Sequence, residues 1–315
     1  MIKKFFSVLV NLKNKEDGAV IALASAALVV ILGLTALVVD VGALVLEKTR
    51  LSNACDAAAL AAARELPSST AAELKALRYL EYNGVSPQEA AVTINEDHNS
   101  ITVEATRTVN YTFARVLGLS SGTVSARSTA VFGAVSSVTG IVPFGIPEQP
   151  LVFGQEYQLK AGSHDDYGPG NYGALALEMP GAKSYRNNLM YGYDGVISVG
   201  DWVETEPGNM SGPTEEGVKY RISQCPHTPR CTIDNYHRDC PMVMIVPIYD
   251  PTVLNGRDKV HIVGFGAFLL KGVEGQGKKS CVTGYFLEMN PPEGLNYTID
   301  PNQTDYGLHG TKLIE

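Results

Sequence analysis

One long apolar segment near the N-terminus dominates the hydropathy pattern of the chain. Residues 19–39, AVIALASAALVVILGLTALVV, are 21 consecutive uncharged residues. A helix of this length is about 31 Å long, which matches the roughly 30 Å hydrocarbon core of a bilayer. The pattern therefore predicts a single transmembrane helix over residues 19–39.

The charges that flank this segment predict its orientation. The tail before it, residues 1–18, carries four lysines, namely Lys3, Lys4, Lys13 and Lys15. Under the positive-inside rule such a basic tail stays in the cytoplasm, so the chain beyond residue 46 should be extracytoplasmic. Two alternatives stay open. A cleaved secretory signal would have a shorter apolar segment, and a buried helix of a soluble core would leave the charge asymmetry unexplained.

The helical pattern continues beyond the apolar segment. Residues 40–67 contain no proline before Pro67, so we expect a stalk helix that ends there. Seven of the ten residues from Ala54 to Ala63 are alanine. Small side chains allow close approach of a second helix, and we expect this face to pack on a partner. Asp40 is expected at the outer membrane interface, with a functional intramembrane carboxylate as the alternative.

The segment from residue 18 to residue 67 resembles a known family. Its order of residues is similar to the N-terminal segment of TadG-like proteins of the tight-adherence (Flp) pilus assembly system, at Gly18, Asp40, Val41, Gly42, Lys48, Arg50, Leu51, Asn53, Ala54 and Asp56 to Ala63. The resemblance implies a bacterial membrane-anchored protein of pilus biogenesis or surface attachment. The chain lacks the Asp-x-Ser-x-Ser motif of a von Willebrand A domain. It also has Leu23 where a cleaved prepilin would have Glu, so neither metal-dependent adhesion nor prepilin cleavage is inherited.

The remaining pattern predicts an α+β protein with two further modules. Residues 68–140 read as a pilin-like helix-plus-strands module, with a helix over 71–84 and alternating strands over 91–96, 100–113 and 122–133. Residues 141–290 combine short apolar runs with glycine and proline turns, which predicts an extracytoplasmic β-rich barrel or sandwich. Within it, residues 260–270 and 281–289 should pair. Residues 291–315 are expected to form a C-terminal tail.

The cysteines leave three kinds of chemistry open. Cys225, Cys231, Cys240 and Cys281 lie in the C-terminal module, and Cys55 lies apart in the alanine-rich helix. For an extracytoplasmic domain we favour disulfides that join Cys225 to Cys231 and Cys240 to Cys281. Zinc held with His227 and His237 and free thiols are the alternatives. The spacings do not repeat the paired C-x₂₋₄-C pattern of structural zinc sites, so the sequence predicts no metal ligand.

Composition and motifs narrow the function. The chain of 315 residues has 25 Lys and Arg against 33 Asp and Glu, a net charge of −8, which argues against nucleic-acid binding. Gly118 to Gly122 fits Gly-x-Ser-x-Gly but lies between predicted strands, so we read it as a turn and expect no catalytic residue and no cofactor. The leading hypothesis is a membrane-anchored structural or assembly protein that contacts pilus components through its stalk. A surface module that binds an extracellular or cell-wall ligand is the alternative, followed by a membrane-tethered hydrolase.

Overall fold

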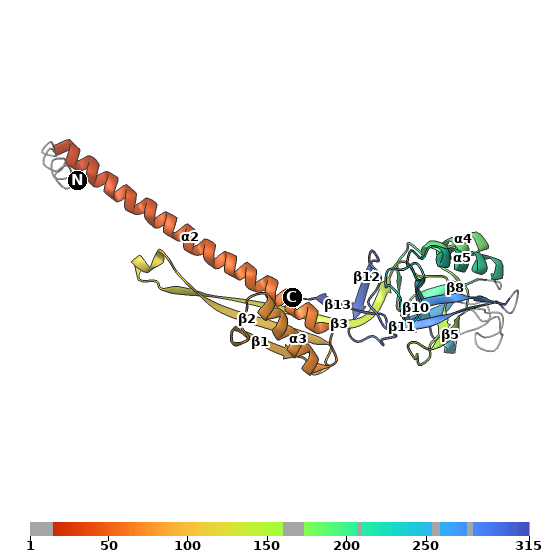
Figure 1. Ribbon diagram of the computed structural model, residues 1–315. Helices are drawn as coiled ribbons and strands as arrows, with labels where there is room; N and C mark the ends of the chain where they lie inside the picture. Colours follow the sequence, from red (N-terminus) through yellow and green to blue (C-terminus); the bar gives the residue numbers. More distant parts are fainter. Residues whose placement is uncertain (1–14, 160–172, 207–209, 254–258, 276–279, 315) are drawn as a thin grey trace. The chain divides into compact units, whose positions relative to one another are not determined.

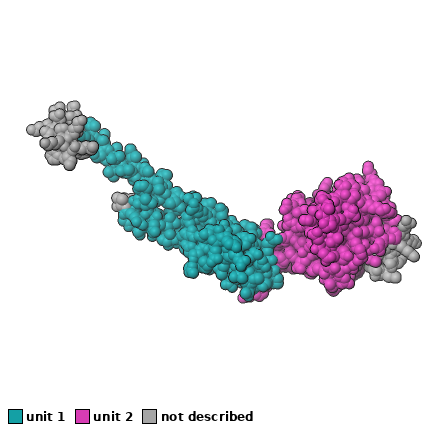
Figure 2. Space-filling model, viewed as in Figure 1, with its two compact units in different colours: residues 1–95, 101–129, 313–315 teal, residues 96–100, 130–312 magenta. Residues whose placement is uncertain are grey.

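The computed structural model describes residues 15–159, 173–206, 210–253, 259–275 and 280–314. The predicted basic tail therefore lies almost wholly outside the described residues. The chain divides into two compact units (Figure 2). Unit 1 comprises residues 1–95, 101–129 and 313–315, and unit 2 comprises residues 96–100 and 130–312.

A long N-terminal helix is the main element of unit 1. Helix α2 (Lys15–Ala63) contains the predicted transmembrane segment and most of the predicted stalk in one uninterrupted run. It is long and apolar enough to cross a membrane, and its most apolar window has no protein cover among the described residues. The helix ends shortly before Pro67, whose fixed backbone angle and missing amide hydrogen disfavour continuation. The α+β fold class with one candidate transmembrane helix is confirmed.

A second helix and an antiparallel sheet complete unit 1. Helix α3 (Ser69–Tyr82) packs against α2 (Figure 1). Three strands follow it in the chain, namely β1 (Ala90–Ile94), β2 (Ser100–Asn110) and β3 (Ser121–Val138). The order is β1-β2-β3, and β1 pairs with β2 so that Val92 faces Val103. Short helices η1 (Pro87–Glu89) and η2 (Ala114–Leu117) precede β1 and follow β2. Ile101, Val103 and Ala105 alternate onto the buried face of β2, as the sequence pattern predicts.

Unit 2 is built around a seven-stranded sheet. Five strands have the order β4-β9-β10-β11-β5, β8 pairs with β10, and β6 pairs with β8. Its longest strands are β9 (Val243–Tyr249), β10 (Val260–Glu274) and β11 (Cys281–Leu287). The predicted pairing of residues 260–270 with 281–289 is confirmed, because Phe268 of β10 faces Phe286 of β11. The shorter strands are β4 (Ile146–Pro147), β5 (Glu156–Leu159), β6 (Leu175–Ala176) and β8 (Trp202–Thr205), with η3 (Pro251–Val253) after β9.

Two features of unit 2 differ from the sequence expectation. Helices α4 (Ala182–Tyr191) and α5 (Ser211–Ser223) pack together, and α5 contacts β10, in a module expected to consist of strands and loops. Residues after 290, expected as a tail, contribute β12 (Tyr297–Asp300) and β13 (His309–Leu313). Both pair with β3, as does β7 (Ile197–Ser198). The C-terminal residues are thus part of a sheet.

Candidate functional site

The exposed side of α2 continues as an apolar groove beyond the predicted span. The groove is open and is lined by residues three or four apart on one helix face, namely Leu37, Val38, Val41, Gly42, Val45, Leu46 and Thr49. A β-carbon added at Gly42 would meet no atom within 4 Å. Within the described part of the chain, no neighbour therefore requires a glycine at position 42. Residues with this spacing form a continuous surface that can pack on lipid or on another helix.

Asp40 joins this helix to the turn between β2 and β3. Its side chain is buried, and its carboxylate accepts hydrogen bonds from three consecutive backbone amides. The amide of Thr112 lies 2.8 Å from Oδ1, and the amides of Phe113 and Ala114 lie 3.1 and 2.6 Å from Oδ2. These amides open the short helix η2, so the carboxylate satisfies donors that have no partner within that helix. Asp40 is a structural anchor for the turn, and we call this contact the Asp40 clasp.

The turn held by the clasp exposes apolar side chains. The side chains of Phe113 and Leu119 are both exposed. This holds for Phe113 even though its backbone amide is bound to Asp40 of α2. Gly118 adopts a left-handed conformation with φ of 85° and ends η2, and residues 118–120 then connect η2 to β3, which begins at Ser121. The turn therefore presents one aromatic and one aliphatic side chain that the described residues leave uncovered.

The alanine-rich face of α2 is occupied by its own chain. Ala54, Ala58 and Ala62 are completely buried, and α2 packs on α3, whose Ala72 and Ala76 are also completely buried. The sequence led us to expect a partner protein on this face, but α3 of the same chain covers it. The exposed groove lies nearer the N-terminus. Cys55 on the same helix donates to the Ala126 carbonyl over 3.7 Å, and burial raises the pKa of its thiol to about 11.

Arg107 forms an ionic cluster that ties four parts of unit 1 together. From β2, its guanidinium donates two hydrogen bonds to Glu89, at 2.8 and 2.7 Å, and one to the Gly84 carbonyl at 2.7 Å. It also forms an ion pair with Glu47 of α2. The hydrogen bonds from Arg107 lower the pKa of Glu89 to about 2. A bidentate pair of this kind fixes both orientation and distance.

Unit 2 brings three of its cysteines together with a histidine. The ligand atoms of Cys225, His227, Cys231 and Cys240 all lie within 4.8 Å of one another. Neither disulfide expected from the sequence is present, because the structure has Cys225, Cys231 and Cys240 as thiols in one cluster. Burial raises the pKa of Cys240 to about 12. At Cys225 burial acts in the same direction but is outweighed by amide and imidazole hydrogen bonds, and the pKa falls to about 6.

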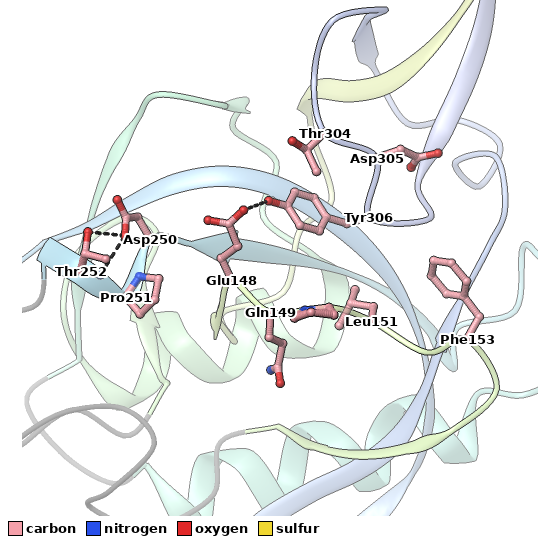
Figure 3. Close-up of a pocket in the computed structure, with 11 residues that line it drawn as sticks. Glu148, Gln149, Leu151, Phe153, Asp250, Pro251, Thr252, Thr304, Asp305 and Tyr306 are labelled. Carbon is pink, nitrogen blue, oxygen red and sulfur yellow. Dashed lines mark hydrogen bonds between the residues drawn. The ribbon is translucent and has the colours of Figure 1, made fainter. Parts of the chain in front are cut away.

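A separate acidic cavity of about 500 Å³ lies in unit 2 (Figure 3). Its carboxylates are Glu148, Asp250 and Asp305. Tyr306 donates to Glu148 over 2.5 Å, and Thr252 donates to Asp250 through its amide and its hydroxyl. Burial and the contact with Glu148 raise the pKa of Tyr306, which keeps its hydroxyl protonated. The cavity offers acceptors for hydroxyl or cationic groups, with Phe153 and Leu151 as an apolar wall.

Comparisons with known proteins assign the N-terminal region. Residues 18–65 match the family described as Flp pilus-assembly TadE/G-like, and residues 42–130 match the family described as Tad-like Flp pilus-assembly. No curated protein and no solved structure matches the chain. The two matched ranges include the exposed groove, the Asp40 clasp and the Arg107 cluster, and they end where unit 1 gives way to unit 2. Both families indicate a structural role in assembly of Flp pili. Residues 18–130 of this chain are thus similar to TadE/G-like and Tad-like Flp pilus-assembly families.

Proposed function

We propose that the protein is a single-pass assembly component of a tight-adherence pilus, with its N-terminus in the cytoplasm and both units extracytoplasmic. The family matches support the pilus role, and the uncovered apolar part of α2 supports anchoring. The lysines before the span support the orientation. The observation that carries the proposal is that the matched residues form one folded unit on an apolar helix.

The groove on α2 is the surface that we assign to pilus partners. It lies on the helix that carries the predicted span, and its residues have no cover within the described chain. A partner with its own membrane-spanning helix can continue its contact from the bilayer onto this surface without burying a polar group. Pilins and other membrane-anchored assembly proteins have such an apolar spanning helix. The Asp40 clasp then holds the adjoining turn in a fixed position beside the partner.

Deletion and complementation test this function. Cells that lack the gene should lose surface pili, and the full-length gene should restore them. A chain in which Val41 and Val45 are replaced by Asn should insert and accumulate but restore few pili. The matched control replaces Glu65, which lies in an exposed ion pair with Lys75, by Gln. Normal piliation of the deletion strain would refute the proposal.

The acidic cavity supports a second candidate function, the binding of a cell-wall or other extracellular ligand by unit 2. Its volume lies within the roughly 300 to 1,000 Å³ of small-molecule sites. Three carboxylates favour ligands rich in hydroxyl or ammonium groups. The purified protein should then sediment with cell-wall fragments. The Glu148→Gln variant should sediment less, whereas a Glu293→Gln variant, changed at an exposed pair with Arg238, should sediment normally. Equal sedimentation of both variants would refute this role for the cavity.

A further inference from the structure

We propose that Cys225, His227, Cys231 and Cys240 bind one zinc ion as a structural centre of unit 2. Three thiol sulfurs and one imidazole nitrogen converge within 4.8 Å, although two of the residues lie up to 15 positions apart in the chain. Three Cys and one His is among the ligand sets of closed, four-coordinate structural zinc sites. A mixed sulfur and nitrogen set of this kind favours zinc over the hard cations, which prefer oxygen.

The distances fit a tetrahedral ion. Zinc lies about 2.3 Å from sulfur and about 2.0 Å from nitrogen, so a tetrahedron places sulfur and nitrogen ligands about 3.5 Å apart. Nδ1 of His227 lies 3.3 Å from Sγ of Cys231 and 3.8 Å from Sγ of Cys225. Both values lie close to the tetrahedral separation. A single hydrogen bond between His227 and one cysteine would not require the sulfurs of the other two cysteines to lie within 4.8 Å as well.

Backbone amides support the sulfur atoms in the way that thiolate ligands require. The chain contains two Cys-Pro-X turns, one at Cys225 and one at Cys240. In each turn the amide of the second residue after the cysteine donates to its sulfur, His227 to Cys225 and Met242 to Cys240. Cys225 also accepts the amide of Cys231. Such hydrogen bonds from outside the ligand set orient metal-bound thiolates and partly neutralise their charge.

Two residues outside the ligand set, His237 and Arg221, support the cluster. The ring of His237 stacks on that of His227, with centroids 3.8 Å apart and planes 10° apart. Arg221 of α5 is buried and donates to the carbonyl of Pro241, over 2.9 Å, and to that of Leu189. Among the described residues these carbonyls are its hydrogen-bond partners. A centre of three thiolates and Zn²⁺ carries a net charge of −1, which complements this buried cation.

Disulfides account for the cluster less well than zinc does. Three thiols cannot all pair with one another, so one disulfide would leave a thiol and an imidazole beside it. The cluster also lies in a segment, residues 224–241, that has no helix and no strand of a sheet between α5 and β9. An ion that joins both ends of this segment supplies the restraint that the missing secondary structure does not. Zinc also keeps the thiolates from oxidation in an extracytoplasmic compartment.

The experiment measures metal and thiols on the full chain, purified from membranes in detergent with a tag that does not bind metal. Elemental mass spectrometry should find about one zinc per chain. Thiol titration of the denatured protein should find Cys225, Cys231 and Cys240 reduced. Exchange into Co²⁺ should produce thiolate-to-metal charge-transfer and intense visible bands of a tetrahedral site. A chelator should lower the melting temperature, and added zinc should restore it.

Matched variants separate this site from other thiols. His227→Ala and Cys231→Ser should reduce bound zinc to a small fraction, whereas Cys55→Ala, changed at a buried thiol of unit 1, should keep it. The wild-type stoichiometry decides the matter even if a variant fails to fold. Iron in place of zinc, reduced thiols without metal, or a disulfide among the three cysteines would each overturn the proposal. These outcomes are independent of pilus assembly, because a zinc-free protein could still restore pili.

Discussion

The ionic cluster around Arg107 gives the clearest quantitative prediction for unit 1. Replacing Arg107 by Gln removes the guanidinium that binds Glu89 through two hydrogen bonds and Glu47 through an ion pair. In the folded protein the pKa of Glu89 falls from 4.5 to about 2. That change corresponds to about 3.4 kcal/mol at most. Because the side chains of Arg107 and Glu89 are 24% and 30% exposed, solvent screens part of the interaction. We expect a loss of about 1 to 2 kcal/mol.

The pH dependence supplies the sign. A carboxylate whose pKa is lowered by folding stabilises the protein fully above its unfolded pKa of about 4.5, and this contribution is lost as the pH falls toward about 2. Wild-type unit 1 should therefore lose stability over this range, and Arg107→Gln should lose less, so that the two converge at low pH. Denaturant titration of the full chain, followed by hydrogen exchange of peptides from β1 and β2, measures this.

A control separates this cluster from ordinary surface charge. Lys75→Gln removes an ion pair with Glu65 in which both side chains are 37% exposed. Such a pair contributes about 0 to 1 kcal/mol. If Arg107→Gln and Lys75→Gln cost the same at neutral pH, or if the cost of Arg107→Gln does not shrink in acid, the reasoning is refuted.

Three further predictions concern the anchor and the helix packing. Asp40→Ala should raise hydrogen exchange at residues 112–114 by about tenfold or more, since three amides lose one shared acceptor, and unchanged protection would contradict the clasp. Ala58→Leu should destabilise unit 1 by about 1 to 3 kcal/mol in a denaturant titration, because it overpacks a completely buried position, whereas full stability would show that the site has room. Protease added to protoplasts should digest the chain beyond residue 46, and protection of both units would reverse the proposed orientation.

Local patterns were sufficient to predict most of unit 1. Three local features predicted its elements: the uncharged run over residues 19–39, the stop at Pro67 and the alternation around Val103. Each depends only on residues that are close together in the chain. The contacts of Asp40 were not accessible in this way. Its acceptor role depends on amides more than 70 positions away, whose approach is set by the sheet and not by the sequence around Asp40.

Unit 2 was harder to predict because its tertiary contacts oppose local preference. Helix α5 contains Gly212, Pro213 and Gly217, which together suggest a loop. A β-carbon at Gly217 would lie 2.6 Å from the side chain of Leu189 in α4, so the residue that weakens the helix also permits the two helices to pack.

The convergence of the cysteines was hidden by their spacing. Cys225, Cys231 and Cys240 do not form the short pairs by which zinc sites are recognised in sequences. Cys-Pro occurs at residues 225 and 240, a repeat that played no part in the prediction from sequence. The repeat is informative only once the fold brings the two turns together.

Crosslinking in living cells tests most directly the claim that the exposed groove of α2 contacts other pilus components. A photoreactive residue replaces Val45, which is 60% exposed in the groove, or Ala58, which is 0% exposed against the chain's own packing. We predict that the probe at position 45 gives an adduct with another membrane protein of the pilus assembly system, identified by mass spectrometry, and that the probe at position 58 gives none. Absence of an intermolecular adduct at position 45 in cells that are assembling pili would contradict the account.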